Sequence, residues 1–321
     1  MAWLIFLSRG PLAACVPEPA RKEPPWLLPA SMVALVLFWG LAFVGIKQAL
    51  VHMSWVTLTF LRFAVADVCY VAYLLAVRPR PTRPRAAELP ALAVLAFLGF
   101  TGYHLLLNLG EADPAVTAGT AALIIASAPA FIALLAVPIL QEPLSPARGG
   151  ALALAFAGLA VLVGFAGPGS ALEVRLSPGA LVVLGPAVFT ALYFVLGKRR
   201  LARFPPFVFV AYTILLGTLL TLPLVLATWP EFVRDLGTMG FEGFLPALLL
   251  GIFPTFAGYG IYFRALERMP AAAAGSWLYL STLIAIVGGI LVLGETLPPA
   301  ILLGGTMVIA GVVLAQRLRK R

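Results

Sequence analysis

Charge is scarce in this sequence. Asp, Glu, Lys and Arg make up 11% of its 321 residues, whereas 62% are hydrophobic and the mean hydropathy is +1.03. A soluble globular domain carries about 25% charged residues, because water must wet its whole surface. The composition therefore excludes a soluble enzyme, a nucleic-acid-binding module and a disordered protein. It predicts a polytopic membrane protein.

The residues and motifs of several common chemistries are also missing. The chain has two cysteines, Cys15 and Cys69, two histidines and no Cys-x-x-Cys, so we expect neither a disulfide framework nor a His/Cys metal site. It has no Gly-x-x-x-x-Gly-Lys-Ser/Thr motif for ATP. It also has no carboxylate-rich cluster for Mg²⁺-diphosphate and no K⁺-channel filter sequence. We expect no cofactor, no bound metal and no nucleic-acid partner.

Long apolar stretches dominate what is present. A helix of about 20 residues crosses roughly 30 Å of hydrocarbon at 1.5 Å per residue. Stretches of about that length recur ten times, joined by short connections rich in Pro and Gly: 30–50, 55–77, 90–109, 116–139, 147–165, 178–197, 206–227, 243–264, 271–293 and 299–316. The predicted fold is an all-α polytopic membrane protein with ten transmembrane helices.

The basic residues predict the orientation of these spans. With residues 1–29 and 317–321 as cytoplasmic tails, 18 of the 22 Lys and Arg residues lie in cytoplasmic segments, the exceptions being Lys47, Arg62, Arg175 and Arg234. Cytoplasmic loops are enriched in Lys and Arg. The net charge of +9 is therefore interpreted as a mark of orientation, with both termini in the cytoplasm and the spans in the inner or plasma membrane.

The second half of the chain repeats the first. Offsets of 151, 156 and 153 residues superpose three short patterns: Phe43-Val44-x-x-Lys47 on Phe194-Val195-x-x-Lys198, Phe100-x-Gly102-Tyr103 on Phe256-x-Gly258-Tyr259, and Glu142-x-Leu144 on Glu295-x-Leu297. Each half, 30–165 and 178–316, holds five spans. Because five is odd, the second repeat must enter the membrane from the opposite side. Inverted repeats are typical of secondary transporters, although some channels share the symmetry.

The set of local patterns resembles one known family. The patterns are Phe38-Trp39-Gly40-x-x-Phe43-Val44-x-x-Lys47, Leu61-Arg62-Phe63-Ala64, Gln141-Glu142-Pro143-Leu144, Ala265-Leu266-x-x-x-Pro270-Ala271 and Leu293-Gly294-Glu295-x-Leu297. Together they resemble the EamA-type ten-span transporters of the drug/metabolite transporter superfamily. The resemblance implies a cavity between two inverted repeats and outward movement of amino acids, their derivatives or small amphipathic metabolites. One departure is Thr282, where members often carry a proline, against Pro129 in the first repeat.

Five residues are candidates for gating or coupling. An ionisable group inside a span is costly and so suggests function, but each one also has a structural interpretation as an anchor, an ion pair or a packing residue. Pro129 removes a helical hydrogen bond at mid-span. The candidates are Lys47, Arg62, Asp67, His104 and Pro129. Asp67 is one candidate proton carrier, and Glu142 and Glu295 are expected to cap or tether helix ends.

Ten further residues are candidates for the wall of the substrate cavity. Most are mid-span aromatics, which offer an apolar ring with or without one polar group, and packing between helices is the competing interpretation. They are Trp39, Phe43, Tyr103, Asn108, Ser127, Tyr193, Tyr259, Tyr262, Trp277 and Ser281. An aromatic cavity with little fixed charge favours neutral or zwitterionic amphipathic substrates.

These observations predict a function together with its alternatives. We expect a secondary-active exporter of small organic metabolites that works by alternating access, with the lipid bilayer and a small molecule as its partners. Proton coupling and the oligomeric state stay open. The alternatives are an intramembrane enzyme acting on a lipid-linked substrate and a channel.

Overall fold

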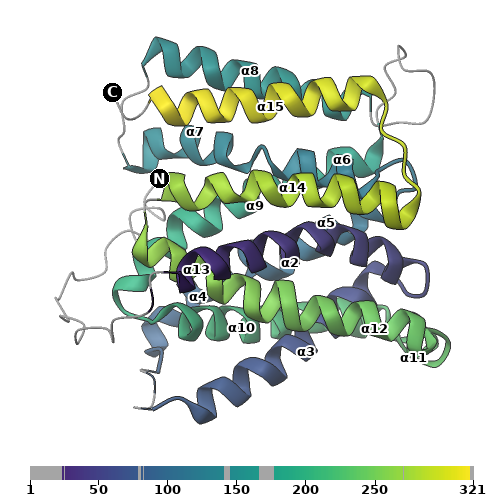
Figure 1. The fold of residues 1–321 in the computed structure, drawn as a ribbon. Helices are drawn as coiled ribbons and strands as arrows, with labels where there is room; N and C mark the ends of the chain where they lie inside the picture. The colour runs from purple at the N-terminus through teal and green to yellow at the C-terminus, as the bar shows by residue number, and fades with distance from the viewer. Residues whose placement is uncertain are drawn as a thin grey trace.

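All ten predicted spans are helical in a computed structural model, which describes residues 24, 26–78, 81, 83–140, 145–165, 177–269 and 271–318. Seven of the spans correspond to one helix each: α2 (Leu27–Leu50), α3 (Trp55–Ala76), α8 (Pro146–Gly164), α9 (Pro178–Lys198), α10 (Pro206–Ala227), α14 (Ala271–Leu293) and α15 (Pro299–Leu318). The described residues contain no strand. The predicted all-α fold is confirmed, and the helices lie side by side in one bundle (Figure 1).

The third and eighth spans are each interrupted by a π-helical turn. The third runs through η1 (Ala86–Glu88), α4 (Leu89–Ala96), η2 (Phe97–Thr101) and α5 (Gly102–Glu111), and the eighth through α12 (Gly240–Leu250), η4 (Gly251–Gly258) and α13 (Tyr259–Arg268). The two π segments contain or adjoin the Phe-x-Gly-Tyr pattern that the repeats share. Such turns are rare and frequently lie at functional sites.

The fourth span is also broken, into α6 (Ala118–Ile125) and α7 (Ala128–Leu140). Pro129 has no N–H to donate, and the Ser127 hydroxyl donates a 2.6 Å hydrogen bond to the carbonyl of Ile124. These two residues supply the local reason for the break.

Among the described residues, one α-helix lies outside the predicted spans. Helix α11 (Trp229–Thr238) mixes apolar and charged residues and joins α10 to α12. Its Asp235 carboxylate accepts hydrogen bonds from the Ser54 backbone N–H (2.8 Å) and the Thr57 hydroxyl (2.8 Å), which ties α11 to the start of α3. A short 3₁₀ turn, η3 (Arg199–Ala202), follows α9.

The packing of the helices repeats between the halves. The ninth span (α14) packs on the first (α2), and the fourth span (α6 and α7) packs on the sixth (α9) in the same way. Likewise, the second span (α3) packs on the π turn η4 of the eighth, and the seventh span (α10) packs on the π turn η2 of the third. The fifth and tenth spans, α8 and α15, pair directly and in opposite directions, because Gly158 lies against Gly304 and Met307 whereas Gly311 lies against Ala151 and Ala155. This antiparallel pairing is what an inverted repeat requires (Figure 1).

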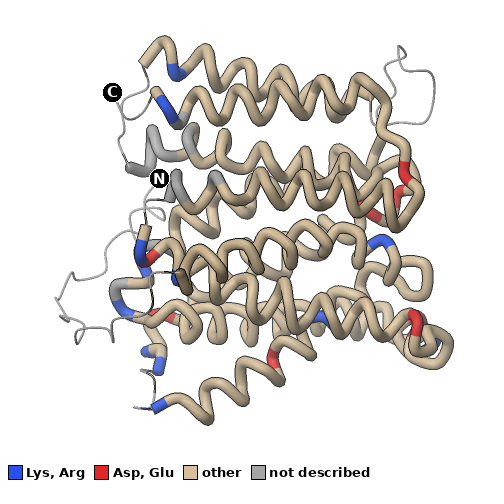
Figure 2. The backbone as a smooth tube through the Cα atoms, viewed as in Figure 1, with Lys and Arg blue, Asp and Glu red and all other residues tan. Residues whose placement is uncertain are grey.

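Surface chemistry separates the sides of the bundle from its ends. Large side chains such as Leu75, Leu226 and Leu291 are exposed, as expected of residues that contact lipid. We call the end that holds the start of α2 and the end of α15 the proximal end, and the opposite end the distal end. Lys and Arg gather at the proximal end (Figure 2).

Candidate functional site

A cavity of about 70 Å³ lies at the centre of the bundle. By the same measure one water needs roughly 10–15 Å³, so the cavity has room for a few waters or a small solute. Helices of both repeats line it, with these side chains: Trp39, Ala42, Phe43, Ile46, Arg62, Tyr103, His104, Leu107, Ala122, Ile125, Ala126, Ala128, Pro129, Thr190, Phe194, Tyr259, Leu278, Tyr279, Ser281 and Thr282.

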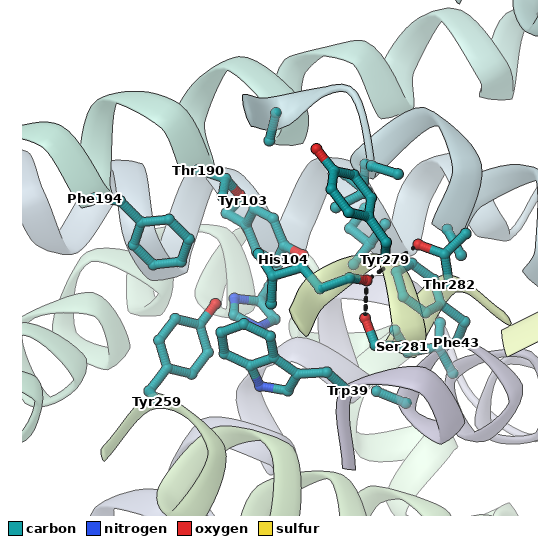
Figure 3. Close-up of a pocket in the computed structure, with 18 of the residues that line it drawn as sticks. Trp39, Phe43, Tyr103, His104, Thr190, Phe194, Tyr259, Tyr279, Ser281 and Thr282 are labelled. Atoms are coloured by element: carbon teal, nitrogen blue, oxygen red, sulfur yellow. Dashed lines mark hydrogen bonds between the residues drawn. The ribbon is translucent and has the colours of Figure 1, made fainter. Parts of the chain in front are cut away.

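Eight of the residues predicted from the sequence lie on this wall. Five come from the cavity group (Trp39, Phe43, Tyr103, Tyr259 and Ser281), and three come from the gating group (Arg62, His104 and Pro129). Trp39 lies against Tyr259 with ring centroids 5.4 Å apart, and its indole N–H donates to the carbonyl of Pro254 at 3.0 Å. Figure 3 shows these aromatic side chains around the cavity.

The other five predicted cavity residues lie away from the wall. Tyr193 and Tyr262 belong to a buried aromatic cluster with Phe194, Phe209 and Phe263, and the Tyr193 hydroxyl is 3.1 Å from that of Thr213. Trp277 packs on the edge of the same cluster. The remaining two make polar contacts elsewhere: the Asn108 amide on α5 donates to the Thr59 hydroxyl on α3 at 2.8 Å, and the Ser127 hydroxyl donates to the carbonyl of Ile124 within its own turn.

Two predicted gating residues also lie off the wall. Asp67 is on α3, with one carboxylate oxygen buried and without a hydrogen-bond partner. Lys47 lies near the distal end of α2, where its ammonium donates to the backbone carbonyls of Glu111 (2.6 Å) and Asp113 (3.2 Å). Lys47 therefore connects α2 to the end of α5.

Several wall residues were not among the candidates named from the sequence, and three of them carry a hydroxyl: Thr190, Tyr279 and Thr282. Tyr279 and Thr282 lie on α14, whose wall face runs through Leu278, Ser281 and Thr282 rather than through Trp277. The Tyr279 hydroxyl is buried and has no hydrogen-bond partner. A usable signal was present for Thr282, which occupies the position matching Pro129 in the other repeat.

Two more polar atoms on the wall have no partner. The Arg62 Nε donates to the Thr255 hydroxyl at 2.6 Å, but its Nη1 is buried without a hydrogen bond. His104 places Nδ1 3.1 Å from the carbonyl of Phe100, and its Nε2 is buried and unpaired. Buried polar groups are nearly always hydrogen-bonded in proteins, so the two unpaired nitrogens require an explanation other than the packing of the described residues.

Polar contacts join several helices at the distal end of the bundle. Besides Lys47, the Glu295 carboxylate accepts from the backbone N–H of Ala118 at 2.8 Å, at the first turn of α6. Glu295 thus caps a helix end, as the sequence predicted, while Glu142 lies outside the described residues. Both carboxylate oxygens of Glu111 are buried without a hydrogen-bond partner beside this network.

Asp113 joins the same network from the loop after α5. Its carboxylate accepts from the Ser177 hydroxyl (2.6 Å) and from the backbone N–H groups of Gly179 (3.0 Å) and Ala115 (2.9 Å). Desolvation raises the pKa of Asp113, but these hydrogen bonds and the nearby charge of Lys47 outweigh it, so the pKa lies below its ordinary value. The network joins α2, α5 and the start of α9.

Comparison with known proteins identifies the family. The model of the EamA-like transporter family matches residues 28–164 and again residues 177–316. A probable terminal-alkyne amino-acid exporter of Streptantibioticus cattleyicolor is 34% identical over 288 residues, which is 89% of this chain and 92% of that protein. A probable amino-acid metabolite efflux pump of Salmonella typhimurium is 25% identical over 87% of this chain and 91% of its own length.

One solved crystal structure has the same fold, with a TM-score of 0.64 and 21% identity over 92% of this chain and 99% of that chain. The family model matches each half of the chain separately, so the chain contains two copies of the unit that the model describes. The chain therefore belongs to the EamA-like transporter family and is a multi-pass membrane transporter of small metabolites, not an enzyme.

Proposed function

We propose that this protein is a secondary-active exporter of small amino-acid-like metabolites and works by alternating access through the central cavity. The observation that carries the proposal is the position of the cavity, which takes its wall from both inverted repeats. Two copies of one unit in opposite senses can adopt outward-open and inward-open arrangements of similar energy. The names of two relatives, an exporter and an efflux pump for amino acids, support the substrate class and the direction.

The orientation follows from the basic residues. With the Lys- and Arg-rich proximal end in the cytoplasm, the distal contacts of Lys47, Asp113 and Glu295 form an exterior seal. The conformation is then closed to the outside. In this proposal the seal opens when the two repeats rock against each other, and Pro129 and Thr282 lie at the matched positions where the wall can bend.

The test is counterflow into proteoliposomes. Vesicles preloaded with one of L-leucine, L-norvaline, L-methionine or L-phenylalanine take up the same labelled amino acid from outside. We expect saturable uptake that unlabelled substrate competes away, in at least one of the four cases. Non-saturating ion current would favour a channel, and the absence of saturable flux for all four would contradict the proposed substrate class.

A matched pair of variants tests the cavity itself. Ala126→Leu adds three carbons to the wall, whereas Ala160→Leu makes the same change at an exposed position of α8. We expect Ala126→Leu to lower uptake and Ala160→Leu to leave it unchanged, at equal yields of folded protein.

A pH gradient across the vesicle, with Asp67→Asn and Glu111→Gln, tests proton coupling at the two buried carboxyls with unpaired oxygens.

A further inference from the structure

The cavity wall carries a buried cation that makes no ion pair with a described residue, and the nearby carboxyl of Glu111 acts on it only from beyond contact distance. Arg62 is 3% exposed, and among the described residues no Asp or Glu carboxylate lies within 4.0 Å of its guanidinium. Its single hydrogen bond goes through Nε to the neutral hydroxyl of Thr255. An unpaired charge inside a membrane protein is costly and usually has a functional reason.

Helix anchoring does not account for this guanidinium. The η4 segment is already held by the Tyr70 hydroxyl, which donates to the carbonyl of Phe256 at 2.7 Å, and by the Trp39 indole, which donates to that of Pro254. The bond from Arg62 Nε uses one of five N–H donors, and a neutral donor would serve the same purpose. The charge and the free Nη1 donor stay unexplained by the fold.

The same wall also offers a hydrogen-bond acceptor. A backbone carbonyl can only accept, so the contact between His104 Nδ1 and the carbonyl of Phe100 places the proton on Nδ1. The unpaired Nε2 then presents a lone pair. The aromatic faces of Trp39 and Tyr259 line the cavity beside it (Figure 3), and such faces attract ammonium groups.

We propose that the cavity recognises the zwitterionic head of an α-amino acid, with the substrate carboxylate on the Arg62 guanidinium and its ammonium between His104 Nε2 and the aromatic rings. This inference rests on the proposed transport function and names its substrate chemistry. The carboxylate supplies the missing counter-charge, and guanidinium–carboxylate pairs are among the strongest hydrogen-bonded contacts in proteins. The remaining apolar wall contacts the side chain of the substrate.

The experiment compares each acid with its carboxamide, which has the same shape and no negative charge. In the counterflow assay with the best of the four amino acids, unlabelled acid and unlabelled carboxamide compete with the labelled substrate. We expect the acid to inhibit at a concentration about tenfold to hundredfold lower, the ratio typical of a lost hydrogen bond to a charged group. Equal inhibition would overturn the carboxylate assignment and leave the transport function standing.

Variants separate recognition from anchoring. Arg62→Met should reduce the acid-to-amide ratio to about one, and Arg62→Lys should retain part of it. Thr255→Val removes the anchoring bond but keeps the guanidinium, so it should preserve the ratio even where it lowers the yield. If Thr255→Val reduces the ratio as fully as Arg62→Met does, Arg62 acts only as a helix anchor.

The wild-type assay distinguishes the two levels of failure. Saturable counterflow without a preference for the acid contradicts only this inference. No saturable counterflow of any of the four amino acids contradicts the proposed function and this inference together. Because each ratio is measured within one preparation, a variant with a low yield of folded protein still gives a usable result.

Discussion

Single residues on the cavity wall carry polar atoms that the fold itself does not use. Arg62 Nη1, His104 Nε2 and the Tyr279 hydroxyl are all buried without a hydrogen-bond partner. A buried polar group left unpaired costs about 1–3 kcal/mol, so its presence in a cavity is best explained by a ligand. Tyr70 is the opposite case, because its hydroxyl is fully used to hold η4.

This contrast predicts different effects for two identical substitutions. Tyr279→Phe should raise the KM for transport about threefold to tenfold and leave the melting temperature unchanged or higher, because it removes an unsatisfied group. Tyr70→Phe should lower the melting temperature, because the carbonyl of Phe256 loses its donor. Transport kinetics and thermal unfolding of both variants check this. A large stability loss in Tyr279→Phe with an unchanged KM would contradict it.

Asp113 gives a prediction about pH. Its pKa lies below the ordinary value of about 4, so the ionised form stabilises the fold above that value. This stabilisation is lost as the pH falls through the lowered pKa. Asp113→Asn should therefore lower the melting temperature by roughly 2–5 °C at pH 7, and the difference from the wild type should shrink toward pH 3.

A suitable control for Asp113 is Glu242→Gln on the exposed surface of α12, which should change little at either pH. Thermal unfolding of the detergent-solubilised protein measures all three proteins. A difference that stays constant from pH 7 to pH 3 would mean that the carboxylate charge of Asp113 does not contribute.

At the scale of helices, the breaks in spans three, four and eight surround the cavity, whereas α8 and α15 are continuous and form a pair at one side of the bundle (Figure 1). Interrupted helices leave backbone groups free to bend or to meet a solute, and membrane proteins tolerate them where they face protein or a wet cavity. The α8–α15 pair instead depends on backbone contact at Gly158, Gly304 and Gly311.

Helix α8 offers a matched test of that contact. A Cβ on Gly158 would lie 2.6 Å from the carbonyl oxygen of Gly304, whereas a Cβ on Gly150 would meet nothing within 4 Å. Gly158→Ala should destabilise the protein by about 1–3 kcal/mol. Gly150→Ala should stabilise it by about 0.5–1 kcal/mol through helix propensity. Thermal unfolding of both variants shows whether each substitution raises or lowers the stability of the protein. Equal effects of the two substitutions would mean that Gly158 is not required for close packing of α8 on α15.

For the whole molecule, the proposed mechanism requires that the cavity be reached from one side at a time. In that mechanism the exterior seal includes Lys47, which joins α2 to the carbonyls of Glu111 and Asp113. Losing this cation removes both contacts and leaves Arg62 as the remaining positive charge near the buried carboxyl of Glu111. The balance between the two conformations should then shift toward outward opening.

Cysteine labelling measures that shift. In a background with Cys15 and Cys69 replaced by Ser, Ser281→Cys places a thiol on the cavity wall. Lys47→Met should increase its labelling by an impermeant reagent added outside several-fold, and Lys47→Arg, which keeps a cationic donor, should increase it less. Identical labelling in all three proteins would show that Lys47 is not part of the seal.

The sequence by itself determined the class, the ten spans and the inverted repeat. The class and the spans depend on hydropathy, which can be read from each stretch of the chain separately. The inversion depends only on whether the number of spans in each repeat is odd or even. The sequence also provided Trp39, Tyr103 and Tyr259 as candidates for the wall, because each is a mid-span aromatic that offers an apolar ring with one polar group. The π turn at η2 has no simple sequence signature, whereas Pro254 lies inside η4 and accounts for the interruption there, because proline has no N–H to donate.

Only the tertiary structure decided which mid-span residue faces the cavity and which packs between helices. One residue along a helix rotates a side chain by about 100°, so Trp277 stays off the wall while Leu278 and Ser281 reach it. The rotation of each helix is set by its neighbours over the whole bundle. The same long-range packing left Arg62 with an unpaired donor, a property that no stretch of sequence contains.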